Sequence, residues 1–128
     1  MIDHTGLEVS DPEKSRHFYE RALAPLGYKQ IKEIPKEYTD GDVVIGFGVP
    51  PKADFWIAEG TPNEPRLHIA FRANSRNLVD EFYKVALAAG GKDDGPPGLR
   101  PHYHKDYYGA FVLDPDGHFI EAVCHSPE

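Results

Sequence analysis

Two histidines and one glutamate lie where they could bind a metal ion together. His4 and His68 lie in alternating apolar and polar segments, and Glu121 interrupts the apolar segment HFIEAV near the end of the chain. A carboxylate in a half-buried strand is costly unless it has a partner, faces water or binds a cation. Two imidazoles and one carboxylate form a ligand set for divalent transition metals that leaves coordination positions open. These three residues therefore define a candidate metal site.

An internal repeat relates the two histidines. Sliding the sequence by 64 residues places His4 on His68 and Gly27 on Gly91 without gaps, and it also superposes Phe18-Tyr19 on Phe82-Tyr83 and Ala22-Leu23-Ala24 on Ala86-Leu87-Ala88. The offset is half the chain length, which is typical of a duplicated unit. We therefore predict one domain over residues 1–128, with repeat copies at 1–64 and 65–128.

Each copy is predicted to fold as a strand, a helix and three more strands, which makes the fold class α+β with two βαβββ units. Ser10-Asp11-Pro12 is typical of a helix start, and the Pro and Gly clusters separate short strands. The first copy is predicted to have strands at 2–9, 28–34, 42–48 and 54–59 and a helix at 12–25. The second is predicted to have strands at 66–73, 92–94, 107–113 and 118–124, a helix at 75–89 and a loop at 95–106.

The strand patterns place the three candidate ligands on the faces turned away from the helices. Alternate residues of a strand point to opposite faces. By this rule His68 opposes its apolar neighbours, Glu121 opposes Ile120 and Ala122, and His4 opposes the apolar side of its strand. If the two sheets curve toward each other, these faces line one cleft. A single histidine in a strand is usually only hydrogen-bonded, and a lone glutamate usually faces water, but the matched positions favour a shared site.

The overall charge favours a small ligand. The net charge of −7 and the pI near 5.4 argue against nucleic acids and anionic membranes, because both need a basic surface. Cys124 is the only cysteine and cannot form an internal disulfide, which indicates a reducing compartment. No apolar run is long enough to span a membrane or to begin a secretory leader. We therefore expect a cytoplasmic location.

The paired βαβββ units, the three candidate ligands and the terminal segment YGAFVLDPDGHFIE resemble the vicinal oxygen chelate superfamily. This superfamily contains glyoxalases, bleomycin-resistance proteins, fosfomycin-resistance enzymes and extradiol dioxygenases. The resemblance implies a curved eight-stranded barrel-like sheet with the helices outside. It also implies that His4, His68 and Glu121 hold one divalent ion (Fe, Mn, Ni or Zn) that chelates two neighbouring substrate oxygens. By the same analogy the protein is expected to be a homodimer.

The sequence departs from the glyoxalases of this group, which draw a fourth ligand from the last strand of the first unit. The 64-residue offset places Ile57 opposite Glu121, and an isoleucine can neither bind a metal nor transfer a proton. Glu59, two residues further on, could replace it only if the register differs. A three-ligand site with open positions is therefore preferred, and glyoxalase activity is not expected.

Other members of the superfamily use further polar residues around the metal. Extradiol dioxygenases add a histidine and a tyrosine, whereas Phe111 occupies the position where spacing from Glu121 places the tyrosine. His102 and His104 of the predicted loop, and Tyr107 directly after it, are therefore the candidate catalytic residues. The candidate substrate-binding residues are Arg72, Phe119, Tyr108 and Phe55. A fosfomycin-type enzyme needs a cationic pocket, for which Arg72, Arg100 and Lys105 are available.

Two structural alternatives remain open. The segment GLRPHYHKDYYG could be a lid over the site or a solvated connection whose aromatic residues contact a second subunit. Trp56 is predicted to pack under the first helix, with a substrate wall as its other possible role.

The sequence thus predicts a divalent-metal-dependent enzyme acting on a small molecule, with dioxygenase-like or lyase-like chemistry. The alternative is a metal-free ligand-binding protein of the bleomycin-resistance type, which would use an aromatic wall in the same cleft.

Overall fold

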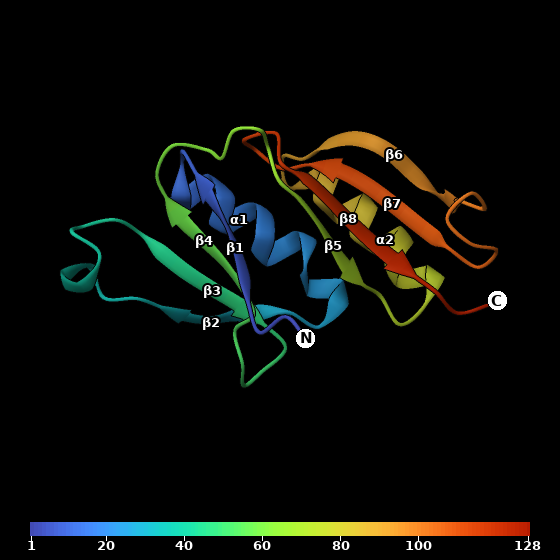
Figure 1. Ribbon diagram of the computed structural model, residues 1–128, viewed down its shortest axis with the longest axis horizontal. Coiled ribbons are helices and arrows are strands. Elements are labelled where there is room, and N and C mark those ends of the chain that lie inside the picture. Colours follow the sequence, from blue (N-terminus) through green and yellow to red (C-terminus); the bar gives the residue numbers. More distant parts are fainter.

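Two four-stranded sheets lie side by side in the computed structural model, which describes all of residues 1–128 (Figure 1). In each sheet the first strand pairs in parallel with the last strand of its unit, and the other pairs are antiparallel. The first sheet has the order β1 (Thr5–Val9), β4 (Phe55–Glu59), β3 (Val44–Gly48), β2 (Lys29–Glu33). The second has the order β5 (His68–Arg72), β8 (Phe119–Cys124), β7 (Tyr108–Leu113), β6 (Lys92–Leu99). The identical orders confirm the predicted βαβββ units.

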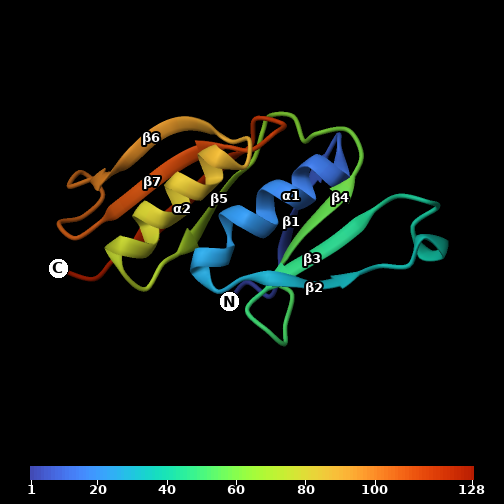
Figure 2. The same ribbon diagram turned by 180° about the vertical axis from the view of Figure 1, so that it is seen from behind.

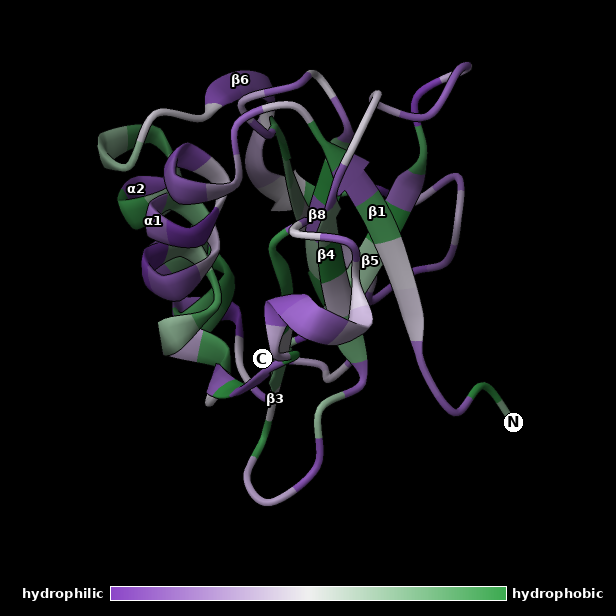
Figure 3. Ribbon diagram, turned by 90° about the vertical axis from the view of Figure 1, so that its left-hand side faces the viewer, coloured by the Kyte–Doolittle hydropathy of each residue, from purple (hydrophilic) through white to green (hydrophobic).

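Both helices, α1 (Pro12–Ala22) and α2 (Arg76–Ala88), lie on the same side of the strands (Figures 2 and 3). The Asp11 side chain caps α1 by accepting a bond from the Lys14 amide, and Ser75 caps α2 in the same way through the Leu78 amide. Each cap satisfies one of the amide groups that a helix start leaves unpaired. The helices pack against each other and cover one face of both sheets.

Helix α1 ends three residues earlier than the predicted limit of residue 25. A proline cannot donate a backbone hydrogen bond, and inside a helix its ring clashes with the preceding turn. Pro25 therefore lies in a short 3-10 turn, Ala24–Leu26, and Gly27 closes the turn with a φ of 86°. Neither helix is long and apolar enough to cross a membrane.

The core lies between the helices and the sheets. From α1 it contains Phe18 and Tyr19, and from α2 it contains Val79 and Phe82, all with no exposed surface. Tyr19 packs edge-to-face against Phe55 of β4, with ring centroids 5.0 Å apart. The inward residues of both sheets complete it: Leu7, Val9, Ile45, Phe47, Ile57, Phe71, Val112, Ile120, Ala122 and Cys124. This face of the molecule is thus closed, and the opposite face of each sheet is left for ligands.

The two sheets agree with the predicted curved, barrel-like arrangement and are not closed into a barrel. Strand β6 differs from the sequence prediction, because it continues to Leu99, into the segment predicted as a loop from residue 95. Register shifts between Asp93 and Gly98 accommodate Pro96-Pro97, and β6 is an edge strand, where proline is tolerated.

The LDPDG turn between β7 and β8 joins the two halves of the molecule. The Asp114 carboxylate accepts hydrogen bonds from the Tyr19 hydroxyl of α1 at 2.6 Å and from the His118 amide at 2.8 Å. His118 has no exposed surface, and its Nε2 lies 3.0 Å from the carbonyl oxygen of Glu8 in β1. Asp116 accepts a bond from the Ser10 hydroxyl before α1. The predicted turn thus also serves as the polar junction of the repeats, which the sequence did not indicate.

Candidate functional site

A histidine, a glutamate and a tyrosine meet on the second sheet. His68 Nε2 lies 2.9 Å from Glu121 Oε1, and the Tyr107 hydroxyl donates a hydrogen bond to Glu121 Oε2. Glu121 is only 1% exposed, whereas the His68 side chain is 57% exposed. Both carboxylate oxygens therefore have partners, which explains how a glutamate is tolerated inside a buried strand.

The strand register puts these side chains on one face. Ala70 pairs with Glu121, so His68, two residues before Ala70, lies on the same face as Glu121. Phe111 of β7 pairs directly with Glu121 of β8, and Phe119 of β8 pairs with His68 of β5. We call this surface, which is turned away from α2, the open face of the second sheet; it carries His68, Arg72, Phe111, Phe119 and Glu121.

Glycine at position 109 makes room for the tyrosine. A Cβ at Gly109 would lie 3.2 Å from Cε1 of Tyr107 and 3.4 Å from Oε2 of Glu121. Burial and then the bond to Glu121 raise the pKa of the Tyr107 phenol well above its usual range. The phenol therefore stays protonated at neutral pH and acts as a hydrogen-bond donor on this face.

His4 lies apart from the other two candidate ligands. It precedes β1 instead of lying within it, because the first strand begins at Thr5 and not at residue 2 as predicted. Its Nδ1 lies 2.7 Å from Asp3 Oδ1, and its side chain is 61% exposed. It borders a hollow over the first sheet together with Trp56 and Val44. Within one chain, no three or more His, Cys, Asp or Glu residues are grouped closely enough to hold a metal ion.

Trp56, and not Ile57, is the repeat equivalent of Glu121. Gly6 pairs with Trp56, whereas its repeat counterpart Ala70 pairs with Glu121. The 64-residue offset is therefore wrong by one residue at the last strand of each unit. A one-residue slip exchanges the two faces of a strand. Trp56 accordingly lies on the face away from α1, and the prediction that it packs under the helix is wrong.

With Trp56 in place of Ile57 as the equivalent of Glu121, β4 still supplies no fourth metal ligand. A tryptophan offers no metal ligand, and the ring of Trp56 fills the space above Gly46. Glu59 does not replace it, because it lies three residues after Trp56 on β4 and therefore on the opposite face of the strand.

The two loop histidines lie away from Glu121. His104 Nε2 lies 2.8 Å from His125 Nδ1, and His104 Nδ1 accepts a bond from the Asp106 amide. His102 is exposed and packs on the ring of Tyr103, with centroids 4.2 Å apart. Of the three candidate catalytic residues, only Tyr107 therefore contacts the proposed ligands.

The candidate substrate-binding residues divide between the two faces of the sheets. Phe119 is 41% exposed on the open face, and Arg72 is exposed on β5. Phe55 is 1% exposed and packs in the core, and Tyr108 donates a hydrogen bond to Asp80 of α2 at 2.6 Å. The wrong face predicted for Phe55 comes from the same register error as that for Trp56, and Tyr108, the first residue of β7, points to the side opposite Tyr107. Neither residue lies on the open face.

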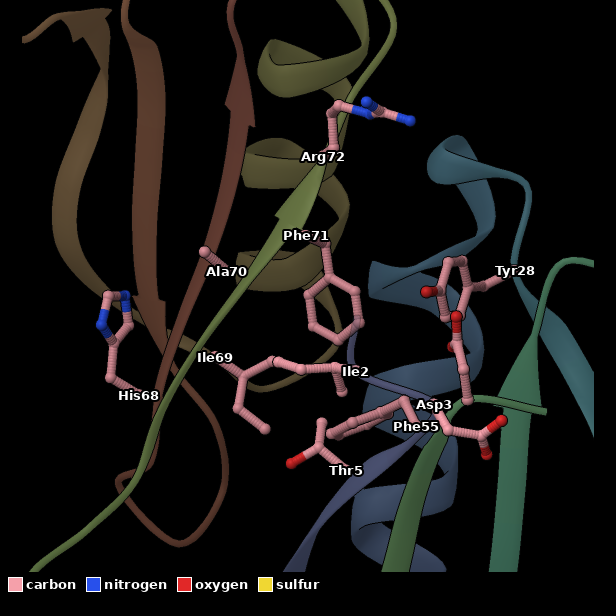
Figure 4. A pocket seen from close by; sticks show the side chains of 11 residues that line it. Ile2, Asp3, Thr5, Tyr28, Phe55, His68, Ile69, Ala70, Phe71 and Arg72 are labelled. Carbon is pink, nitrogen blue, oxygen red and sulfur yellow. The ribbon is translucent and has the colours of Figure 1, made fainter. Parts of the chain in front are cut away.

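A cavity of about 400 Å³ separates the two sheets (Figure 4). Ile69 and Phe71 of β5 point into it toward Phe55 and Tyr28, while His68 points away from them. His68, Ala70 and Arg72 also line the cavity, so His68 lies between the cavity and its partner Glu121.

The residues on the open face fit a divalent ion in part. One imidazole nitrogen and one carboxylate oxygen already converge, and both are ligand types that Fe, Mn, Ni and Zn accept. Glu121 is also oriented by Tyr107, which is how an outer hydrogen bond positions a ligand carboxylate. A third protein ligand is missing from the single chain.

The duplicated sheets and this polar pair agree with the sequence comparison. Residues 1–122 match the family model described as Glyoxalase/Bleomycin resistance protein/Dioxygenase superfamily. The chain therefore belongs to this superfamily. No protein with a curated description matches the sequence.

Solved structures of the same superfamily share the fold. A glyoxalase/bleomycin resistance protein from Albidiferax ferrireducens is 26% identical, with a TM-score of 0.71, and the match covers 95% of this chain and 97% of that one. A variant of glyoxalase I from Zea mays is 23% identical, with a TM-score of 0.70, covering 95% of this chain and 46% of that one.

A third solved structure carries a metal ion. It is a variant of the fosfomycin resistance protein of Listeria monocytogenes, complexed with Mn(II) and 1S,2S-dihydroxypropylphosphonic acid. It is 22% identical to this chain, with a TM-score of 0.66, and the match covers 96% of this chain and 88% of that one. At this sequence identity, the similarity between the two structures shows a shared fold and nothing more.

Proposed function

We propose that this protein is a divalent-metal-dependent enzyme that chelates two neighbouring oxygens of a small substrate, with His68 and Glu121 as ligands. The observation that carries the proposal is the nearly fully buried Glu121 carboxylate with the His68 imidazole 2.9 Å away on an open sheet face. A purely structural strand position would gain more from an apolar residue, because burying a carboxylate is costly. A catalytic metal site needs this carboxylate.

The third ligand is proposed to be His4 of a second copy of the chain. His4 precedes β1 of the first sheet and His68 lies on β5 of the second, and the chain alone groups no three possible metal ligands. Strands β1 and β5, which carry or adjoin these histidines, are both sheet edges. An edge strand presents unpaired amide and carbonyl groups to another strand. A homodimer that brings β1 of one copy to β5 of the other would join the two halves of the site.

The residues of the open face have separate roles in this proposal. A bound divalent ion would act as a Lewis acid toward the two substrate oxygens. Tyr107 holds Glu121 in place by donating its one hydroxyl hydrogen to the carboxylate. Phe119, 41% exposed beside His68, offers an apolar contact that excludes water from that side. Both oxygenase and lyase chemistry are compatible with this arrangement.

A metal-free binding protein of the bleomycin-resistance type is the second candidate. It is favoured by the absence of three grouped ligands within the chain and by the fact that His68 and Tyr107 already satisfy Glu121. In this case the open face would bind its ligand through Phe119 and the neighbouring side chains.

The partner and location proposals rest on composition. The net charge of −7 supports a small-molecule partner over nucleic acid or an anionic membrane surface. Cys124 is buried and unpaired, which supports a reducing compartment such as the cytoplasm.

Metal reconstitution tests the function. After chelator treatment and separate incubation with Fe(II), Mn(II), Ni(II) and Zn(II), we expect about one tightly bound ion per chain for at least one metal, measured by elemental analysis. Iron with oxygen-consuming activity would indicate a dioxygenase, and Ni or Zn would indicate lyase-type chemistry. Failure of all four metals to bind would favour the metal-free binding protein.

A further inference from the structure

Arg100 is the one half-buried arginine without a carboxylate partner. Four arginines of the chain are half-buried. Arg16 pairs with Glu13 and Glu33, Arg66 with Glu64, and Arg76 with Asp106 and Glu128. No acidic side chain forms an ion pair with Arg100. Partial burial of a cation without an anionic partner is unfavourable, so a bound anion at this position would be stabilising.

The guanidinium of Arg100 is held in a fixed position. Its Nη1 donates to the Gly98 carbonyl at 2.9 Å and its Nη2 to the Pro96 carbonyl at 2.8 Å. The group lies over the ring of Phe111, 5.1 Å from the centroid. A guanidinium has five N–H donors, so three remain for a ligand. Because the side chain is already ordered, binding an anion costs little additional conformational entropy.

Two glycines make this arrangement possible. A Cβ at Gly98 would lie 3.2 Å from Nη1 of Arg100, and one at Gly95 would lie 3.3 Å from Nη2. The segment Gly95-Pro-Pro-Gly98 therefore forms a backbone cradle into which the guanidinium fits. A lysine in place of Arg100 could not make both carbonyl bonds with a planar fork.

Arg100 belongs to the same face as the proposed metal ligands. Phe111, on which it lies, pairs directly with Glu121 across β7 and β8. The backbone amide of Arg100 donates to the carbonyl of Tyr107 at 2.8 Å, so the two residues, each next to a strand end, continue the pairing of Leu99 with Tyr108. Directly opposed residues of two strands point to the same face. The cation thus lies next to the Tyr107 and Glu121 pair.

We propose that Arg100 is a specificity-determining residue and that the substrate carries an anionic oxygen group, a carboxylate, phosphate or phosphonate, close to its chelating oxygens. This inference rests on the proposed function for the position of the chelating oxygens, but the anion site itself does not need the metal. The open-face cation contrasts with the net charge of −7 of the whole chain, so it provides a local attraction for an anion that the rest of the surface repels.

A pair of chelating probes that differ in charge tests the proposal on the metal-loaded protein. We expect 3,4-dihydroxybenzoate to bind about tenfold more tightly than 3,4-dihydroxybenzamide, measured by calorimetry. Arg100→Gln should remove this preference while leaving the affinity for the neutral amide unchanged. Arg21→Gln, an exposed arginine of α1, is the matched control and should retain the preference. Equal binding of both probes by the unsubstituted protein would overturn the inference.

A second measurement separates this inference from the proposed function. In the metal-free protein, inorganic phosphate should shift the Nε–H resonance of Arg100, and Arg100→Gln should weaken phosphate binding about tenfold while Arg100→Lys weakens it less. Phosphate binding that does not depend on Arg100 would overturn the inference. If the protein binds no metal but phosphate still binds at Arg100, the proposed function fails and the anion site stands.

Discussion

Asp114→Ala is expected to lower the free energy of unfolding by about 3–5 kcal/mol. The carboxylate is 4% exposed and accepts three hydrogen bonds, from the Tyr19 hydroxyl and from the amides of Asp116 and His118. Removing it leaves three donors unsatisfied, two of them on the turn that joins the repeats. Urea unfolding followed by circular dichroism measures the change.

Two variants of this junction make the prediction specific. Asp114→Asn keeps one oxygen for the two amides and should lose about half as much stability as the alanine variant. Tyr19→Phe removes only the hydroxyl and should lose about 1–2 kcal/mol. If Asp114→Ala lowers the free energy of unfolding by less than about 1 kcal/mol, this turn does not hold the two halves together.

His68→Ala is expected to weaken the binding of the preferred divalent ion about a hundredfold or more, since loss of an outer hydrogen-bonding partner alone costs about 10–100-fold. The histidine is 57% exposed, so its removal should leave the fold intact. Calorimetric titration of the chelator-treated protein measures the affinity.

Exposed His102 supplies the matched control for this prediction. His102→Ala removes an exposed imidazole that packs on the ring of Tyr103, and the metal affinity should remain within about twofold. Tyr107→Phe removes the hydroxyl that holds Glu121 and should give an intermediate loss. Unchanged affinity in His68→Ala would exclude His68 as a ligand.

The sequence predicted most of the fold because each element carries its own local signals. The Asp11-Pro12 start of α1 and the alternating residues of β5 and β8 follow from capping and strand geometry. The extension of β6 through Pro96-Pro97 could not be predicted, because it depends on bulges opposite β7. The repeat also gave the topology, since each unit forms the same sheet.

The candidate site was predicted less completely than the fold. Strand alternation correctly put His68 and Glu121 on one face, and their contact in the structure agrees with that. The one-residue shift between Gly6–Trp56 and Ala70–Glu121 was invisible in the aligned repeats, because it lies in the loops before the last strands. The distance of His4 from His68 and Glu121 depends on how the two sheets are arranged relative to each other, and no local sequence pattern encodes that arrangement.

A mixing experiment tests most directly whether His4 of one copy completes the His68 and Glu121 pair of another. His4→Ala and Glu121→Gln homodimers should each bind the metal about a hundredfold more weakly or worse, and so carry almost none when the metal is limiting. Co-expressed with different tags and isolated as the mixed dimer, they should recover about one ion per dimer, because one of the two sites then has all three ligands. A mixed dimer without metal, or a His4→Ala homodimer that binds metal as tightly as the unsubstituted protein, would contradict the shared site.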